Sequence, residues 1–302
     1  MSSMRHDPSH VRGPSFGPSS RVSADARGRR PSLSIIVPAK NEADSLPQLV
    51  SEIVAAFRPK VRGETAGPRL DEFEIVVVDD GSTDRSPEVL RELMIKNPEL
   101  RPVRLASNVG QSGATSAGFH ASRMDYVAIL DADLQNNPAD LATLWDALPG
   151  HDVALGWRVK REDVWSKRVT SRWANRVRNK MLGQSIKDTG CSVRIFPREV
   201  ALRLPMFHGV HRFFGPLLLR DGCRVVQVPV THRSRPHGTS HYTFRNRSLK
   251  VIIDLFGVAW LMRRTIRYEL AASPGETVPA PNASYAQNAS RTVSSRENGR
   301  DV

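Results

Sequence analysis

Short apolar runs and helix-spaced apolar positions alternate along the first half of the chain. The runs at 33–37, 73–78 and 126–130 contain β-branched residues, and a polar cluster follows each of them. Between the runs, apolar residues recur at helical spacing, most clearly over 45–57. Strands that alternate with helices form a mostly parallel sheet covered on both faces, in which the strands are continuously apolar. The pattern therefore predicts an α/β fold.

Weaker patterns extend this prediction along the rest of the chain. They indicate helices over 86–96, 113–122, 138–148 and 165–182, and short strands over 103–105, 153–155, 193–196 and 224–230. A loop rich in Arg, His and Gly over 233–242 precedes a last amphipathic helix over 246–264. The two ends of the chain have no apolar periodicity, and their Ser- and Pro-rich composition predicts disorder.

Composition excludes several classes of protein. Of the 302 residues, 39% are hydrophobic and 25% are charged, which is ordinary for a globular protein. Two cysteines are too few for a disulfide scaffold and favour a reducing compartment. The first 30 residues lack the apolar stretch of a secretory signal, and the nearly apolar run at 251–262 is too short to span a bilayer. We therefore expect a cytoplasmic protein that can attach to a membrane without crossing it.

The formal charge of +13 is distributed unevenly along the chain. Residues 31–150 carry a net charge of −7, whereas residues 151–270 carry +16. The acidic part could hold a metal, and the basic part could hold phosphates or contact anionic lipid. Charge alone, however, more simply indicates solubility and nonspecific binding of polyanions.

Three polar clusters follow the apolar runs, over 38–42, 79–84 and 131–135. In open α/β sheets, ligands bind outside the carboxyl ends of the strands. Three clusters on one edge of the sheet therefore predict a binding site. A carboxylate at such a strand end can accept hydrogen bonds from the ribose hydroxyls or the base of a nucleotide.

The third cluster has the residue types of a metal site. Asp131 and Asp133, with the side-chain carbonyl oxygen of Gln135, suit a hard divalent cation that bridges phosphates. The alternative is a strand-ending turn with two solvated carboxylates. In the same way, residues 79–82 also suit a turn that caps the next helix, and Glu42 also suits the first turn of a helix.

Taken together, the clusters resemble the motifs of inverting family 2 glycosyltransferases with the GT-A fold. The matching sequences are Val-Pro-Ala-Lys-Asn-Glu over 37–42, Val-Asp-Asp-Gly-Ser-Thr-Asp over 78–84, Asn-Val-Gly over 108–110 followed by Gly113, and Asp-Ala-Asp-Leu-Gln over 131–135. The similarity extends over residues 32–266 and is strongest to the polyprenyl-phosphate branch, which resembles dolichol-phosphate mannose synthase. That branch is indicated by Arg158, the segments 188–194 and 235–240, and Asp-Leu-Phe-Gly over 254–257.

The resemblance implies a nucleotide-sugar donor and a divalent cation, Mg²⁺ or Mn²⁺. It assigns the metal to Asp131, Asp133 and Gln135. The residues that it assigns to the nucleotide are Pro38, Ala39, Asn41, Glu42, Asp79, Asp80, Gly110, Asp131 and Ala132. The catalytic residues that it implies are Asp133, Arg158, Asp188 and Arg235, of which Asp188 has no single role across the family.

On the acceptor side, the resemblance implies a basic phosphate site and a loop that closes over the diphosphate. The phosphate site is assigned to Arg158, Lys167, Arg168, Ser171 and Arg172. The loop is assigned to Arg235, Ser240 and His241. The branch usually has Lys at the last of these positions. A histidine there would make binding of the diphosphate by the loop pH-dependent near a pKa of about 6.5.

These assignments predict metal-assisted transfer of a sugar, with inversion, from GDP-mannose or a UDP-hexose or uronate to a polyprenyl (dolichyl or undecaprenyl) phosphate. A lipid phosphate is anionic at neutral pH, so its site needs Arg and Lys and no general base. The alternative is a family 2 glycosyltransferase that acts on a glycan hydroxyl, with Asp188 as the base. A polyanion-binding protein without catalysis is a third interpretation, but it leaves the acidic strand ends unexplained, and no nucleic-acid motif is visible.

The predicted organisation has four parts: a disordered basic arm over 1–30, a GT-A domain over 31–245, an amphipathic helix over 246–268 and a disordered tail over 273–302. Within the domain, residues 31–150 are expected to hold the donor and residues 151–245 the acceptor.

The last helix has two interpretations that the sequence leaves open. Its apolar face consists of Leu249, Ile252, Ile253, Phe256 and Trp260, and basic residues flank it on both sides. Such a helix can lie in the interface of a membrane, or it can pack on the sheet. We expect peripheral attachment to the cytoplasmic face of a membrane, or attachment through an integral-membrane partner.

Overall fold

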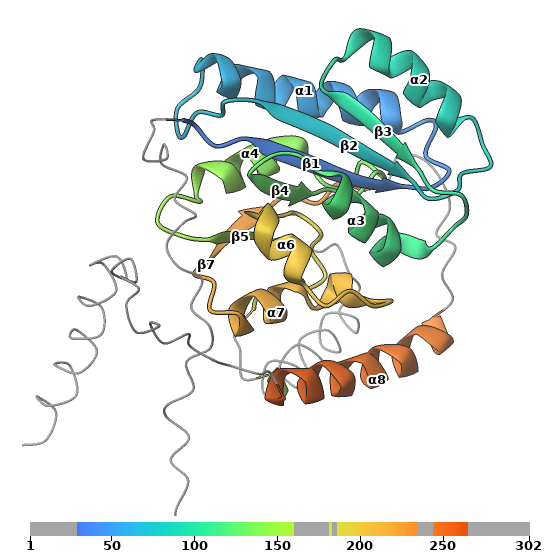
Figure 1. Cartoon of the computed structure of the whole chain (residues 1–302), viewed down its shortest axis with the longest axis vertical. Helices are drawn as coiled ribbons and strands as arrows, with labels where there is room; N and C mark the ends of the chain where they lie inside the picture. The colour runs from blue at the N-terminus through green and yellow to red at the C-terminus, as the bar shows by residue number, and fades with distance from the viewer. Residues whose placement is uncertain (1–28, 160–180, 183–185, 235–243, 265–302) are drawn as a thin grey trace, which may run out of the picture.

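A computed structural model describes residues 29–159, 181–182, 186–234 and 244–264 of the chain (Figure 1). In this part, seven strands form one sheet in the order β3-β2-β1-β4-β6-β5-β7. The strands are β1 (Leu33–Ala39), β2 (Phe73–Asp79), β3 (Leu100–Arg104), β4 (Tyr126–Ile129), β5 (Val153–Arg158), β6 (Arg194–Pro197) and β7 (Val225–Val230). The strands run parallel except β6, which is antiparallel to both of its neighbours, β4 and β5.

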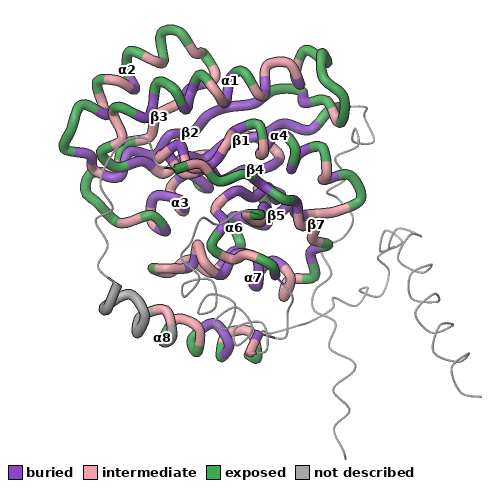
Figure 2. The backbone as a smooth tube through the Cα atoms, turned by 180° about the vertical axis from the view of Figure 1, so that it is seen from behind, coloured by how far each residue is buried: buried purple, intermediate pink, exposed green. Residues whose placement is uncertain are grey.

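Helices cover both faces of the sheet (Figure 1). One face is covered by α1 (Leu46–Arg62), α2 (Ser86–Lys96) and α4 (Pro138–Asp146). The other is covered by α3 (Gly110–Ala121), α6 (Arg198–Arg203) and α7 (Phe214–Arg220), with a short 3-10 helix η1 (Val210–Arg212) before α7, and α8 (Phe244–Arg263) packs on this layer. In both views α8 lies beyond α7, on the side away from the sheet (Figures 1 and 2).

The core has two layers, because successive residues of each strand point to opposite faces of the sheet. In β1, Leu33, Ile35 and Val37 pack in the layer of α1 and α4, and Ile36 packs in the layer of α3. All four side chains are fully buried, as are the central strands in general (Figure 2). Burial on both faces explains why the strands are apolar at successive positions.

The predicted α/β fold is confirmed, with shifts at the ends of some elements. β1 and β2 continue into the polar clusters, to Ala39 and Asp79. β3 begins at Leu100, earlier than predicted, because it pairs with β2 along its whole length. Helix α3 begins at Gly110 because the Asp80 carboxylate binds the backbone N–H groups at its start.

Other predictions fall wholly or partly outside the described residues. The helix predicted over 165–182 is described only at 181–182, which are helical. The ends predicted to be disordered lie outside, apart from residues 29 and 30, and Arg29 forms an ion pair with Asp125. Helix α8 runs from Phe244 to Arg263, and residues 265–268 of the predicted span of 246–268 lie outside the described residues.

Candidate active site

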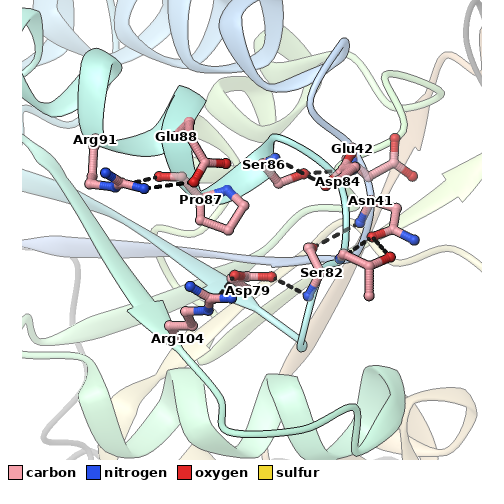
Figure 3. A network of polar contacts seen from close by, with 11 residues as sticks. Asn41, Glu42, Asp79, Ser82, Asp84, Ser86, Pro87, Glu88, Arg91 and Arg104 are labelled. Atoms are coloured by element: carbon pink, nitrogen blue, oxygen red, sulfur yellow. Dashed lines mark hydrogen bonds and ion pairs between the residues drawn. The ribbon is translucent and has the colours of Figure 1, made fainter.

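The loops after β1 and β2 meet at the carboxyl edge of the sheet and bind each other (Figure 3). Asn41 has a φ of 55°, and its backbone N–H donates to the Ser82 hydroxyl at 2.9 Å. Its side-chain Oδ1 accepts from the backbone N–H of Thr83 at 2.8 Å. The backbone N–H of Glu42 donates to Ser86 Oγ at 3.0 Å. These contacts make one rigid rim from the first two predicted clusters.

Asp79 ends β2 and is buried, with 2% of its surface exposed. Its Oδ1 accepts from the backbone N–H of Ser82 at 2.8 Å, which closes a turn of the Asx type. Its Oδ2 has no hydrogen-bond partner among the described residues, although Arg104 Nε lies 3.5 Å away as an ion-pair partner (Figure 3). A buried carboxylate oxygen without a donor is costly. This oxygen is therefore suited to accept an N–H group from a ligand.

Asp80 holds the start of α3 against the loop after β2. Its two carboxylate oxygens accept from the backbone N–H groups of Val109 at 2.7 Å and Gly110 at 2.9 Å. Between these loops, Gly81 has a φ of 65°, and a Cβ atom there would lie 2.8 Å from the backbone nitrogen of Asn108. Only glycine fits so close an approach at this φ. In this structure, Asp80 therefore positions Gly110.

The turn after β4 alternates between buried and half-buried residues. Ala132 and Leu134 are buried in the core, whereas Asp131, Asp133 and Gln135 are half-buried. Leu134 has a φ of 61°, which is unfavourable for a residue with a Cβ atom. Packing of its side chain in the core holds this conformation. The alternation leaves three oxygen-bearing side chains outside the core at the edge of the sheet.

The Asp131 carboxylate lies in a group of polar side chains. Gln111 Nε2 donates to its Oδ1 at 2.9 Å. Burial raises the pKa of Asp131, and the Asp133 carboxylate adds to the rise, while a hydrogen bond from Ser192 and the charge of Arg194 act in the opposite direction. Two carboxylates that disfavour each other's charge are stabilised together by a bound cation.

The residue types of this turn fit a hard divalent cation. Two carboxylates and the amide oxygen of Gln135 are oxygen donors, the ligands that Mg²⁺ and Mn²⁺ prefer. Across the described ranges, no group of three or more His, Cys, Asp and Glu side chains could hold a metal ion. A cation at Asp131 and Asp133 would therefore take its other ligands from Gln135, from water or from a bound diphosphate.

Arg158 and Asp188 form a bidentate ion pair at the end of β5. The guanidinium Nε and one terminal nitrogen lie 2.7 and 3.1 Å from the two carboxylate oxygens. Burial acts to lower the pKa of Arg158, but the hydrogen bonds and charge of Asp188 outweigh it and raise that pKa. Asp188 Oδ1 also accepts from the backbone N–H of Gly190 at 3.0 Å. Asp188 thus holds a permanently charged arginine at the edge of the sheet.

The structure brings together the predicted site residues of the loops after β1, β2, β4 and β5. Seven predicted residues lie outside the described part of the chain: Lys167, Arg168, Ser171, Arg172, Arg235, Ser240 and His241. Three residues that the prediction did not assign to the site also contact or face Asp131: Gln111, Ser192 and Arg194. The last two belong to the 188–194 segment of the family resemblance, whereas nothing in the sequence singled out Gln111.

Helix α8 presents apolar side chains to solvent. Ile253, Phe256 and Trp260 share one face and are 61%, 61% and 59% exposed. The opposite side of the helix packs on the domain through the buried Val258 and Ala259. Two further members of the predicted apolar face have side chains that the structure does not describe: Leu249 and Ile252. Among the helices of the described residues, none has both the length and the apolar character to cross a membrane.

The strand order and the acidic loops at the carboxyl edge define a domain with the GT-A fold. A mannosyltransferase from Pyrobaculum calidifontis, solved in complex with GDP-mannose and Mn²⁺, has a TM-score of 0.55 and 21% identity, over 85% of this chain and 69% of that chain. Glucosyl-3-phosphoglycerate synthase from Mycobacterium tuberculosis, solved with UDP, has a TM-score of 0.54 and 20% identity, over 79% of this chain and 83% of that chain. These similarities concern the fold, and they confirm the GT-A prediction.

The family follows from the sequence comparison. The model of a family described as "Glycosyl transferase family 2" matches residues 34–204, which is more than half of the chain. This chain belongs to glycosyl transferase family 2, as the motifs predicted.

Two relatives carry names that specify a lipid phosphate. Undecaprenyl-phosphate 4-deoxy-4-formamido-L-arabinose transferase of Edwardsiella ictaluri is 37% identical over 213 residues, which cover 70% of this chain and 62% of the relative. Dodecaprenyl-phosphate galacturonate synthase of Rhizobium johnstonii is 32% identical over 241 residues, which cover 78% of this chain and 68% of the relative. The chain thus spans less than two thirds of the length of the first of these proteins.

Proposed function

We propose that this chain transfers a sugar from a nucleotide-sugar to a polyprenyl phosphate, with inversion at the sugar and a divalent cation at the donor. The observation that carries the proposal is the ion pair of Arg158 with Asp188. A hydroxyl acceptor would need a base, but both oxygens of Asp188, the candidate for that role, bind Arg158. A phosphate acceptor is already anionic and needs a fixed cation instead. The names of the two lipid-phosphate transferases support the same acceptor.

The acceptor phosphate binds at Arg158 in this proposal. A guanidinium has five N–H donors in a rigid plane, and Asp188 engages two of them. The others suit the oxygens of a phosphate. Because the carboxylate fixes the plane of the guanidinium, the phosphate is oriented as well as attracted, which favours attack on the sugar carbon.

The donor binds along the rim formed by the other loops. Asp79 Oδ2, the buried oxygen that has no hydrogen-bond partner among the described residues, accepts an N–H group of the base. Asp131 and Asp133 hold Mg²⁺ or Mn²⁺, with Gln135 as a third oxygen donor. When bound, the cation offsets the negative charge that develops on the leaving diphosphate.

The proposal is tested with the purified full chain, Mg²⁺ or Mn²⁺, a short polyprenyl phosphate and a panel of GDP- and UDP-sugars. Mass spectrometry should detect a lipid-phosphate-sugar with one donor of the panel. The matched control is the corresponding polyprenol, which lacks the phosphate and should give no product. Transfer to the polyprenol or to a glycan hydroxyl, without transfer to the lipid phosphate, would contradict the proposed acceptor.

The acceptor is a lipid, so we further propose that the exposed face of α8 attaches the chain to the cytoplasmic face of a membrane. The face combines three exposed apolar side chains with two exposed arginines at its end, Arg263 and Arg264. Arg264 lies over the Trp260 ring at 5.4 Å. An apolar face bordered by cations suits the boundary between acyl chains and anionic headgroups.

The Trp260→Ser variant should bind anionic phospholipid vesicles about tenfold more weakly than the unaltered chain, since it removes a large apolar contact with the acyl region. Co-sedimentation with vesicles measures the change. The control is Ile95→Ser in α2, at the opposite end of the molecule (Figure 1), which removes a side chain that is 86% exposed. Equal vesicle binding by both variants and the unaltered chain would show that α8 is not the membrane contact.

A further inference from the structure

The segment 188–194 contacts both sides of the proposed site. At its start, Asp188 holds Arg158 in the bidentate pair, on the acceptor side. Near its end, Ser192 Oγ accepts from Nδ2 of Asn136 at 2.9 Å, directly after the turn that contains Asp131, Asp133 and Gln135, on the donor side. A displacement of this segment would therefore change the position of a phosphate-binding cation and of the proposed metal-binding turn together.

Arg194 anchors the segment from within the sheet. It is the first residue of β6, where it pairs with Ile129 of β4 and Leu155 of β5. Its Nε donates to the backbone carbonyl oxygen of Ser192 at 3.3 Å, and a terminal nitrogen donates to that of Cys191. The side chain therefore reaches back from the strand and holds the two residues before it by their backbone.

The burial of Arg194 is energetically unfavourable by itself. The residue is 5% exposed, and burial lowers its pKa. The charges of Asp131 and Asp188 act in the opposite direction on that pKa, and the guanidinium lies over the Phe214 ring at 5.3 Å. An apolar side chain could pack on that ring without the cost of burying a charge. The guanidinium adds two things that an apolar side chain cannot: hydrogen bonds to two carbonyl groups, and a charge that acts on Asp131.

We propose that Arg194 is a positioning residue for the transfer reaction. By holding the carbonyl groups of Cys191 and Ser192, it fixes the spacing between the acceptor-side Arg158 and the donor-side turn that ends beside Asn136. The assignment of one side to the acceptor and the other to the donor rests on the proposed function. The structural connection between the two sides rests only on the contacts of the 188–194 segment.

The test compares Arg194→Met and Arg194→Lys with Arg198→Met in the full chain. Methionine keeps an unbranched apolar side chain that can pack on Phe214 but removes both donors, whereas lysine keeps the charge and one donor group. Arg198 is the matched control, because its Nε donates to the backbone carbonyl oxygen of Ser122 at 2.8 Å, outside the proposed site. Its replacement removes a similar contact from the same region of the fold.

Three measurements separate positioning from stability. They are hydrogen exchange of the 188–194 amides in the metal-free chain, the calorimetric affinity for Mn²⁺ with UDP or GDP, and the KM for polyprenyl phosphate. For Arg194→Met we expect faster exchange, about tenfold weaker Mn²⁺–nucleotide binding and about tenfold higher KM, as for the loss of a group that orients a metal ligand. Arg194→Lys should lie between this variant and the unaltered chain, and Arg198→Met should match the unaltered chain in all three.

The control Arg198→Met is expected to change only the free energy of unfolding. If Arg194→Met also changes nothing else, Arg194 is not a positioning residue. Should this variant fail to fold, Arg194→Lys provides the same comparison. Exchange and Mn²⁺–nucleotide affinity are measured without acceptor. If the chain transfers no sugar to polyprenyl phosphate, the proposed function is wrong. Hydrogen exchange and Mn²⁺–nucleotide affinity would still show whether Arg194 positions the 188–194 segment.

Discussion

The Asp133→Ala variant is expected to lose sugar transfer by about a thousandfold or more, while its fold is kept. A cation that offsets charge on a leaving diphosphate contributes several kcal/mol to the rate, and each 1.36 kcal/mol is about tenfold. The described side-chain contact of Asp133 is a hydrogen bond from the backbone N–H of Gln135 at 3.2 Å, whose loss costs about 1 kcal/mol. Removal of the carboxylate also relieves its repulsion of Asp131. The effect therefore falls on activity and not on stability.

Transfer is measured at increasing Mn²⁺, together with urea unfolding of the same preparation. The control is Asp71→Ala, which removes an exposed carboxylate just before β2, at the opposite edge of the sheet from the site. It should leave both transfer and the free energy of unfolding unchanged. Full transfer by Asp133→Ala at saturating Mn²⁺ would remove the metal assignment from this residue.

The Arg158→Lys variant is expected to lower kcat/KM for polyprenyl phosphate by about 10- to 100-fold. A hydrogen bond to a charged group contributes about 1.5–3 kcal/mol, and an ammonium cannot bind Asp188 and a phosphate through one rigid plane. The charge itself is kept, so the half-buried Asp188 carboxylate still has a cation beside it. Because the change is confined to the acceptor side, the affinity for Mn²⁺ with nucleotide should stay within twofold.

The matched control is Arg224→Lys. Arg224 forms the same kind of bidentate pair, with Asp152 at 3.1 and 2.9 Å, but at the amino ends of β5 and β7. Steady-state kinetics with varied acceptor should show an unchanged KM for this variant. If Arg158→Lys also leaves the acceptor KM within twofold, the phosphate does not bind at Arg158, and the acceptor assignment is wrong.

Much of the fold was predictable because its determinants are local. The alternation of apolar runs with helix-spaced positions placed β1, β2, β4 and α1 near their observed positions. Turn-forming and acidic residues directly after those runs indicated the edge of the sheet where Asp79 and Asp131 lie. Local patterns were less informative at β3, which depends on pairing with β2 and has only one buried residue, Leu100.

Hydrophobic periodicity was thus sufficient for the α/β class, and the motifs that follow the strands were sufficient for the resemblance to GT-A glycosyltransferases. Those properties depend on neighbours in sequence. Packing between distant segments determined the rest of the site: the antiparallel direction of β6 carries Arg194 and Asp188 to the carboxyl edge, where Asp188 binds Arg158, 30 residues earlier. Packing likewise determined that α8 buries Val258 and Ala259 and leaves its other apolar face exposed. No periodicity specifies such contacts, because they depend on which surfaces fit together once the sheet has formed.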